Sequence, residues 1–209
     1  MMISIHQLFG WLTAAALLAG FWPYIRDIFK GKTKPERASW VIWGVLLAIA
    51  FFTQLSEGAK WSLVMPGLDF FIVSFIFMLS VKYGSGGLIK RDVVSLTVAV
   101  FGLVLWGITK QPLTALLIVI GIGAIATYLT LVKTFRAPST ETLFAWIMSS
   151  ISGICAILAV NHLRFGLLVY PIFIFLADTS VMLTILIGRK HHKNKQKPSK
   201  DSPPIFEIP

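Results

Sequence analysis

The sequence predicts an all-α membrane protein with seven transmembrane helices, in which two parallel three-helix bundles are joined by a single helix. The first observation is composition: of 209 residues, 56% are hydrophobic and only 13% are charged, whereas a soluble domain has about 25% charged residues. The second is the alternation of charge between the polar loops. The third is a set of residues that recurs at a constant offset along the chain. Together they leave little room for a folded aqueous domain.

Seven apolar stretches come close to the roughly 20 residues that a helical span needs. They cover residues 6–29, 39–56, 61–81, 92–109, 112–134, 142–160 and 166–187. The first three spans make up a bundle over residues 1–87, the fourth is a linker helix within 88–111, and the last three make up a second bundle over 112–188. The basic, proline-containing segment 189–209 is expected to be a disordered tail.

Positive charges set the orientation of these spans. The first, third and fifth loops and the tail hold 16 of the 19 Lys and Arg residues, and the opposite side has only Lys60, Lys110 and Arg164. Since cytoplasmic loops retain positive charge, the N-terminus is expected outside and the tail in the cytoplasm. This bias suits a bacterial inner membrane. The first span lacks a basic region before its apolar core, so we expect a retained helix and not a cleaved signal.

Two loop regions match each other 103 residues apart, which indicates an internal repeat. Three helices that begin outside end inside, so a second copy with the same orientation requires one extra crossing. The span at 92–109 supplies that crossing and gives a 3+1+3 plan with parallel repeats. The matched pairs are Lys30 with Lys133, Pro35 with Pro138, Ser39 with Thr142, and Trp43 with Trp146.

Pro23-Tyr24 lies near the cytoplasmic end of the first span and is followed by the basic loop and helix start GKTKPERASWVIW. This arrangement resembles the SWEET/PQ-loop (MtN3-like) transporter superfamily, in which a Pro-Gln dipeptide precedes a short basic loop and a small hydroxyl residue. The resemblance implies alternating-access transport of a small polar solute such as a sugar, amino acid or vitamin precursor. It also implies that Pro23 and Tyr24 act as a hinge or gate. Tyr24 replaces the family's Gln, and the second copy has Ala126-Thr127 without proline.

Two carboxylates lie inside predicted spans, Asp69 in the third and Asp178 in the seventh. An Asp at mid-helix costs about 2.5–3.5 kcal/mol on insertion scales and usually marks a pathway or a proton relay. We therefore expect both to contact the solute, with proton coupling as a second role. Their offset is 109 and not 103, so they are expected to face one cavity at different depths. The structural alternative is that Asp69, three residues after Pro66, caps a kinked helix.

Tryptophans and an amide supply the other candidate binding groups. Trp43 and Trp146 occupy matching positions, and Gln54, eleven residues after Trp43, lies about 20° away on the same helix face. An aromatic surface with few polar groups suits a small polar ligand. The alternative is that these tryptophans belong to the interfacial belt. Trp22 and Trp40, nearer the helix ends, fit that belt better.

No metal-ligand cluster, phosphate-binding loop or nucleophile–histidine pattern is visible, so we expect neither a metal, a cofactor nor an enzymatic activity. An intramembrane enzyme would need its two aspartates close together, which the unequal offsets disfavour. The net charge of +10 follows the loops, which suits anionic lipid headgroups and not nucleic acid. The alternative function is a non-transporting membrane receptor or regulator on the same scaffold, with the basic tail as its partner-binding element.

Overall fold

The computed structural model describes residues 3–85 and 112–195, together with Thr97, Phe101, Val104, Gly107 and Ile108. In this part of the chain every regular element is helical, which confirms the all-α prediction. The predicted fourth span at 92–109 and the linker at 88–111 fall mainly outside the described residues. The seventh crossing therefore stays a prediction.

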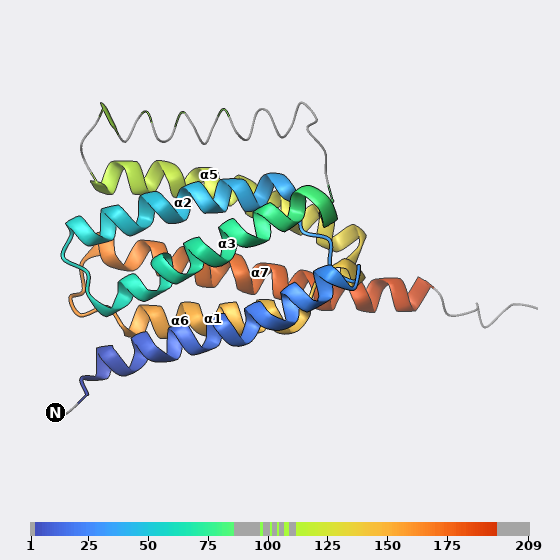
Figure 1. The fold of residues 1–209 in the computed structure, drawn as a ribbon, viewed down its shortest axis with the longest axis horizontal. Helices are drawn as coiled ribbons and strands as arrows, with labels where there is room; N and C mark the ends of the chain where they lie inside the picture. Colours follow the sequence, from blue (N-terminus) through green and yellow to red (C-terminus); the bar gives the residue numbers. More distant parts are fainter. Residues whose placement is uncertain are drawn as a thin grey trace, which may run out of the picture.

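Six α-helices and two short 3-10 turns make up the described fold (Figure 1). The helices are α1 (Ile5–Phe29), α2 (Arg37–Ser56), α3 (Val64–Tyr83), α5 (Pro112–Arg136), α6 (Leu143–Leu158) and α7 (Phe165–Lys195). The 3-10 turns, Trp61–Leu63 and Pro138–Thr140, precede α3 and α6. Five segments are long and apolar enough to cross a membrane by length and composition, whereas α6 is shorter, which is consistent with a multi-pass membrane protein.

Helix α7 continues past the predicted end of its span. It reaches Lys195, so the first part of the segment 189–209 is helical and the expectation of disorder is wrong there. Basic side chains near a helix C-terminus interact favourably with the helix dipole, which favours this extension into a basic sequence. Residues 196–209 lie outside the described part.

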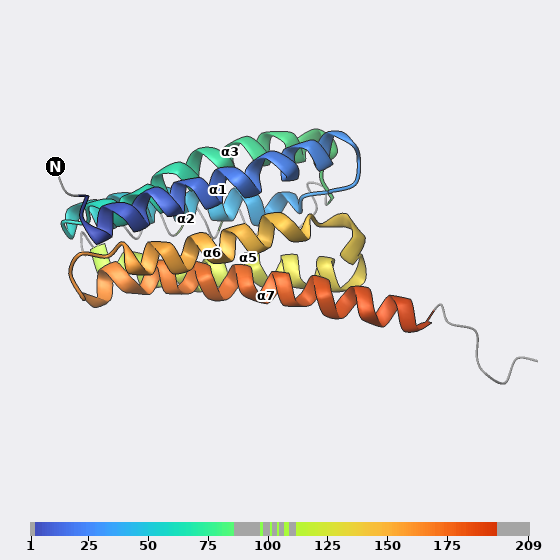
Figure 2. The same ribbon diagram turned by 90° about the horizontal axis from the view of Figure 1, so that it is seen from below.

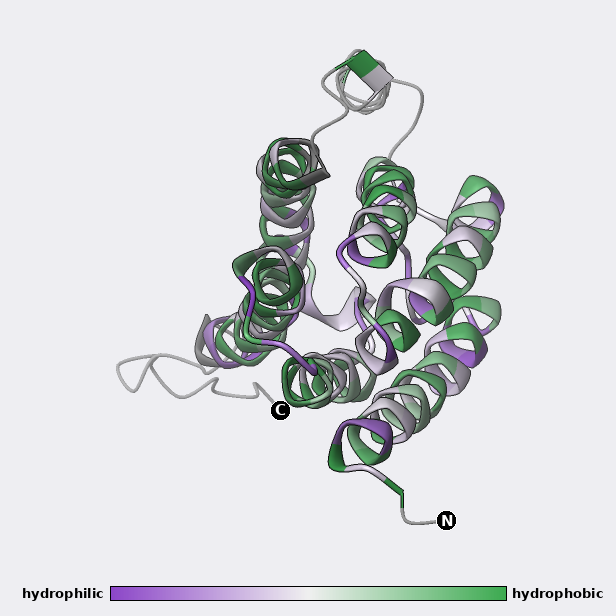
Figure 3. Cartoon of the chain, turned by 90° about the vertical axis from the view of Figure 1, so that its left-hand side faces the viewer, coloured by the Kyte–Doolittle hydropathy of each residue, from purple (hydrophilic) through white to green (hydrophobic). Residues whose placement is uncertain are grey.

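The outward faces of the helices are strongly apolar. Trp22 is 72% exposed and Phe71 is 71% exposed, and hydrophobic colour covers most of the bundle when it is viewed end-on (Figure 3). Soluble monomers rarely expose contiguous apolar surface on this scale. Lipid contact explains this surface, because hydrocarbon solvates these side chains as well as a protein core does.

The helices pack in the cyclic order α1–α3–α2–α5–α7–α6, with α6 contacting α1 again. Figure 2 shows α1, α2 and α3 on one side and α5, α6 and α7 on the other. Small residues permit the closest approach between the two sides. A Cβ added to Gly20 of α1 would meet the Cβ of Met148 at 3.0 Å and the carbonyl oxygen of Ala145 at 3.1 Å. Gly20 therefore lets α1 lie directly against α6, as small residues do in membrane bundles.

The two ends of the bundle differ in charge. At one end α1 leads into α2 through residues 30–36, and α5 leads into α6 through residues 137–142. We call this the basic end, because it holds the Lys- and Arg-rich loops, and we call the other the opposite end. At the basic end the two loops meet directly, where the Lys34 backbone N–H donates to the carbonyl oxygen of Thr140 at 3.1 Å.

Candidate functional site

Two small neighbouring cavities lie inside the ring of helices, with volumes of about 60 and about 50 Å³. Both are lined by Trp40, Asp69, Trp146 and Ser149, which come from α2, α3 and α6. Cavities of this size hold a few water molecules, whereas small-molecule sites usually have roughly 300 Å³ or more. Both cavities are therefore smaller than a usual small-molecule site.

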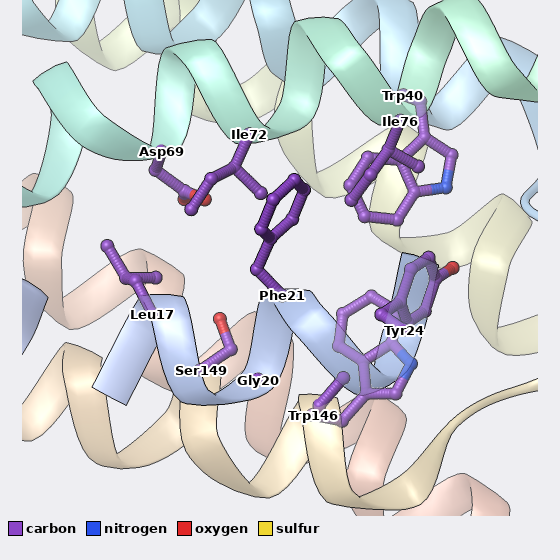
Figure 4. A pocket seen from close by; sticks show the side chains of 11 residues that line it. Leu17, Gly20, Phe21, Tyr24, Trp40, Asp69, Ile72, Ile76, Trp146 and Ser149 are labelled. Carbon is purple, nitrogen blue, oxygen red and sulfur yellow. The ribbon is translucent and has the colours of Figure 1, made fainter. Parts of the chain in front are cut away.

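An aromatic cluster forms one wall of these cavities. The ring centroids of Trp40 and Trp43 are 5.3 Å apart, those of Trp43 and Trp146 are 6.0 Å apart, and Tyr24 lies 5.5 Å from Trp40. Figure 4 shows Trp40, Tyr24 and Trp146 gathered at one end of the pocket. We call Tyr24, Trp40, Trp43 and Trp146 the aromatic wall. It joins the two tryptophans that the repeat pairs in sequence.

Trp40 corrects an expectation from the sequence. It is only 8% exposed and lines both cavities, so its assignment to the interfacial belt is wrong. Trp22, at 72% exposed, remains on the outer face. The sequence placed both near helix ends but could not show which way each helix turns its tryptophan, and this rotation separates a cavity residue from a belt residue.

Both predicted carboxylates border the second cavity. Asp178 of α7 accepts a hydrogen bond of 2.5 Å from the Ser149 hydroxyl of α6. Asp69 of α3 has no hydrogen bond or salt bridge to any other described residue, and Figure 4 shows its carboxylate and the Ser149 hydroxyl directed into the same space. No side chain caps the start of α3, so the capping alternative for Asp69 is wrong. The carboxylates thus face the cavity from two different helices.

Gln54 lies away from these groups, since it lines neither cavity. It is 1% exposed, and neither atom of its amide has a hydrogen-bond partner in the described structure. Its angle on α2 agrees with that of Trp43, but eleven residues of helix separate the two by about 16 Å along the axis. The sequence gives no sign of Tyr170, a fully buried tyrosine of α7 whose hydroxyl has no hydrogen-bond partner among the described residues.

A buried carboxylate, Glu141, joins the aromatic wall to the basic end. Its Oε2 accepts hydrogen bonds from the Tyr24 hydroxyl at 3.2 Å and from Trp146 Nε1 at 3.0 Å. Its Oε1 accepts from Lys133 Nζ at 2.5 Å, and its side chain is only 1% exposed. Arg189 of α7 donates to its backbone carbonyl oxygen at 3.3 Å. Glu141 therefore bonds to residues of α1, α5, α6 and α7 at the basic end of the cavity. We call these contacts the Glu141 network.

A second set of contacts closes the same end. The Thr142 hydroxyl donates to Asp27 Oδ2 at 3.1 Å and lies 2.5 Å from the Thr33 hydroxyl. These bonds connect α1 and the first basic loop to the start of α6. Of the predicted hinge pair, Pro23 lies inside α1 and Tyr24 takes part in the Glu141 network. The hinge role itself stays a prediction, and Tyr24 contacts Glu141, which joins several helices at the basic end.

Glu141 was not a candidate in the sequence, because it lies in a polar loop where a carboxylate is ordinary. Its burial depends on packing between α1 and the second basic loop, which periodicity does not reveal. The closest hint in the sequence is spacing: Glu141 lies five residues before Trp146 and eight residues after Lys133. No family model, curated protein or solved structure matches this chain. A function therefore has to be argued from the cavity and its network.

Proposed function

We propose that the protein is a SWEET/PQ-loop-like membrane transporter that moves a small polar solute by alternating access. The observation that carries this proposal is the shared cavity. Trp43, Trp146, Asp69 and Asp178 come from four different helices, and all four line the second cavity inside the ring. Carboxylates in membrane spans face pathways or partners because hydrocarbon solvates them poorly.

The packing order of the helices supports two equivalent halves. In each half the third helix packs between the other two, so that α3 contacts α1 and α2, and α7 contacts α5 and α6. The halves meet through α1 with α6 and through α2 with α5. If α1, α2 and α3 correspond to α5, α6 and α7, the contact between α1 and α6 is equivalent to the contact between α5 and α2. Parallel repeats related by an axis along the membrane normal require this equivalence. We propose a 3+1+3 chain whose linker helix falls in 88–111.

The closed basic end supports one step of the transport cycle. A solute that leaves through this end has to part Tyr24 and Trp146 from Glu141, because both side chains line the first cavity and donate to this residue of the second basic loop. Tyr24 and Trp146 also belong to the aromatic wall. A solute that displaces these two side chains would therefore also disturb their hydrogen bonds to Glu141. Alternating access requires this kind of connection between site and gate.

The proposed setting is a bacterial inner membrane, with the N-terminus outside and the basic end in the cytoplasm. Positive charge concentrated at one end supports this orientation. Asp69 and Asp178 are the candidates for proton coupling, because a carboxylate in the pathway can exchange a proton as the solute binds and leaves.

Reconstitution tests the proposal. Purified protein in proteoliposomes is given labelled sugars, amino acids and vitamin precursors, and uptake is compared with that of empty liposomes. We expect saturable uptake of at least one solute, abolished in Asp178→Asn and reduced in Asp69→Asn. Glu57→Gln makes the same chemical change at the end of α2, outside both cavities, and should transport normally.

Uptake no faster than leakage for the whole panel would contradict the transport proposal. The proton-coupling role has its own test, because a pH-sensitive dye inside the liposomes reports proton movement. If solute uptake proceeds in Asp69→Asn and Asp178→Asn at the wild-type rate at every pH, these carboxylates do not couple protons to transport.

A further inference from the structure

We propose that the transported solute is a small organic cation, such as an amine, a guanidinium or a quaternary ammonium compound. This inference rests on the proposed function, since it names the class of solute that the same cavity takes. Three observations on the cavity carry it: the charge of its lining, the arrangement of its aromatic rings, and the use of several of its hydrogen-bond donors by protein acceptors.

The lining is acidic without a compensating cation. Asp69 and Asp178 both border the second cavity, and within residues 3–85 and 112–195 no lysine, arginine or histidine lines either cavity. Lys133, in the last turn of α5, is already paired with Glu141. A buried charge normally has a partner of opposite sign. A cationic solute supplies that partner, whereas an anionic solute would face two carboxylates.

The aromatic wall adds attraction for the same charge. The indoles of Trp40, Trp43 and Trp146 contact one another in pairs, with centroid separations between 5.3 and 6.4 Å. Trp40 and Trp43 meet edge to face, at an interplanar angle of 86°, so the cluster presents ring faces in more than one direction. Cations bind over aromatic faces, with tryptophan the strongest of these, and cages of several rings recognise quaternary ammonium groups.

Three hydrogen-bond donors that line the cavities already donate to protein carboxylates. Trp146 Nε1 and the Tyr24 hydroxyl both donate to Glu141, and the Ser149 hydroxyl donates to Asp178. The carboxylates at the cavity, by contrast, accept and cannot donate when ionised. The cavity therefore favours a solute that brings donors or positive charge, and suits a sugar, which needs both kinds of partner, less well.

Matched pairs of ligands test charge alone. Choline and 3,3-dimethylbutan-1-ol have nearly the same shape, but only choline is charged, and arginine and citrulline differ in the same sense. Each is titrated into the purified full-length protein in detergent, with tryptophan fluorescence and isothermal calorimetry as readouts. We expect choline or arginine to bind at least 10-fold more tightly than its uncharged partner.

Variants connect this preference to the cavity. Asp69→Asn with Asp178→Asn should abolish the difference within each ligand pair, whereas Glu57→Gln should keep it. Trp43→Leu should weaken binding of the cation at least 10-fold, whereas Trp22→Leu, the same change on the outer face, should not. Size-exclusion chromatography confirms that each variant is folded.

The outcomes separate this inference from the transport proposal. If uncharged ligands bind as well as the cations, or if neither cation binds, the cation inference is wrong. Transport of a sugar or of a neutral amino acid in proteoliposomes would then leave the proposed function standing. Charge-selective binding that survives in the double aspartate variant would also overturn the inference, because the selectivity would come from another site.

Discussion

Replacing Glu141 by Gln should open the basic end of the protein. The substitution removes the negative charge opposite Lys133 and keeps one amide oxygen, which can still accept from Tyr24 and Trp146 as Oε2 does. Breaking a buried ion pair costs about 3–5 kcal/mol. The lower end applies here, because the Lys133 side chain is 13% exposed and still donates to the Thr140 carbonyl oxygen.

A loss of about 3 kcal/mol from the closed form alone changes the ratio of closed to open protein roughly 100-fold. The assay measures how fast an impermeant maleimide, added on the basic side of oriented vesicles, modifies a cysteine placed at Ala145. This position lines the first cavity. The only native cysteine, Cys155, is replaced by Ala beforehand. We expect the modification rate to rise at least 10-fold in Glu141→Gln and to stay unchanged in Glu57→Gln.

A double variant keeps the test valid if the single variant folds poorly. Glu141→Gln with Lys133→Met removes both charges and leaves no unpaired ammonium group, so stability should largely return. The basic end should still open, because the charged link between α5 and the second basic loop is gone. A folded double variant with the parent modification rate would refute a gating role for the Glu141 network.

Two further changes test the packing and the site. Gly20→Ala introduces a Cβ 3.0 Å from that of Met148, and overpacking of this kind costs about 1–3 kcal/mol; it should lower the melting temperature in detergent. Gly121→Ala is its control, since nothing lies within 4 Å of the added Cβ, and it should be neutral or stabilising; equal effects of the two would contradict close α1–α6 packing. Ser149→Ala removes the hydrogen bond to Asp178, and since bonds to charged groups contribute about 1.5–3 kcal/mol, solute affinity in binding titrations should change roughly 10-fold. An unchanged affinity would exclude Ser149 from the site.

Helix positions could be predicted from the sequence because apolar runs of membrane-spanning length have few other structures available. The candidate carboxylates could be found for the same reason, since Asp69 and Asp178 stand out in apolar surroundings. Trp40 could not be assigned, because its distance from a helix end does not reveal which way the helix is turned. Gln54 was chosen as a candidate because it shares the helix face of Trp43. It lines neither cavity, because it lies too far along α2.

Loop residues were the least predictable part of the site. Glu141 is buried by contacts that come from α1, α5 and α7, and no pattern within its own loop signals them. The 103-residue match did indicate that the two basic loops are related, and the structure brings them together at Lys34 and Thr140. Sequence repetition indicated that the two basic loops are related, but the buried carboxylate between them is visible only in three dimensions.

The most direct test asks whether the cavity can be reached from each side of the membrane in turn. Ala177 of α7 lines the second cavity beside Asp178, so a cysteine at this position, in the Cys155→Ala background, reports access to the site. We expect impermeant reagents to modify it slowly from either side, and a transported solute to protect it. Glu141→Gln should increase its modification from the basic side and decrease it from the opposite side. A cysteine that reacts from one side only, under all of these conditions, would contradict alternating access through this cavity.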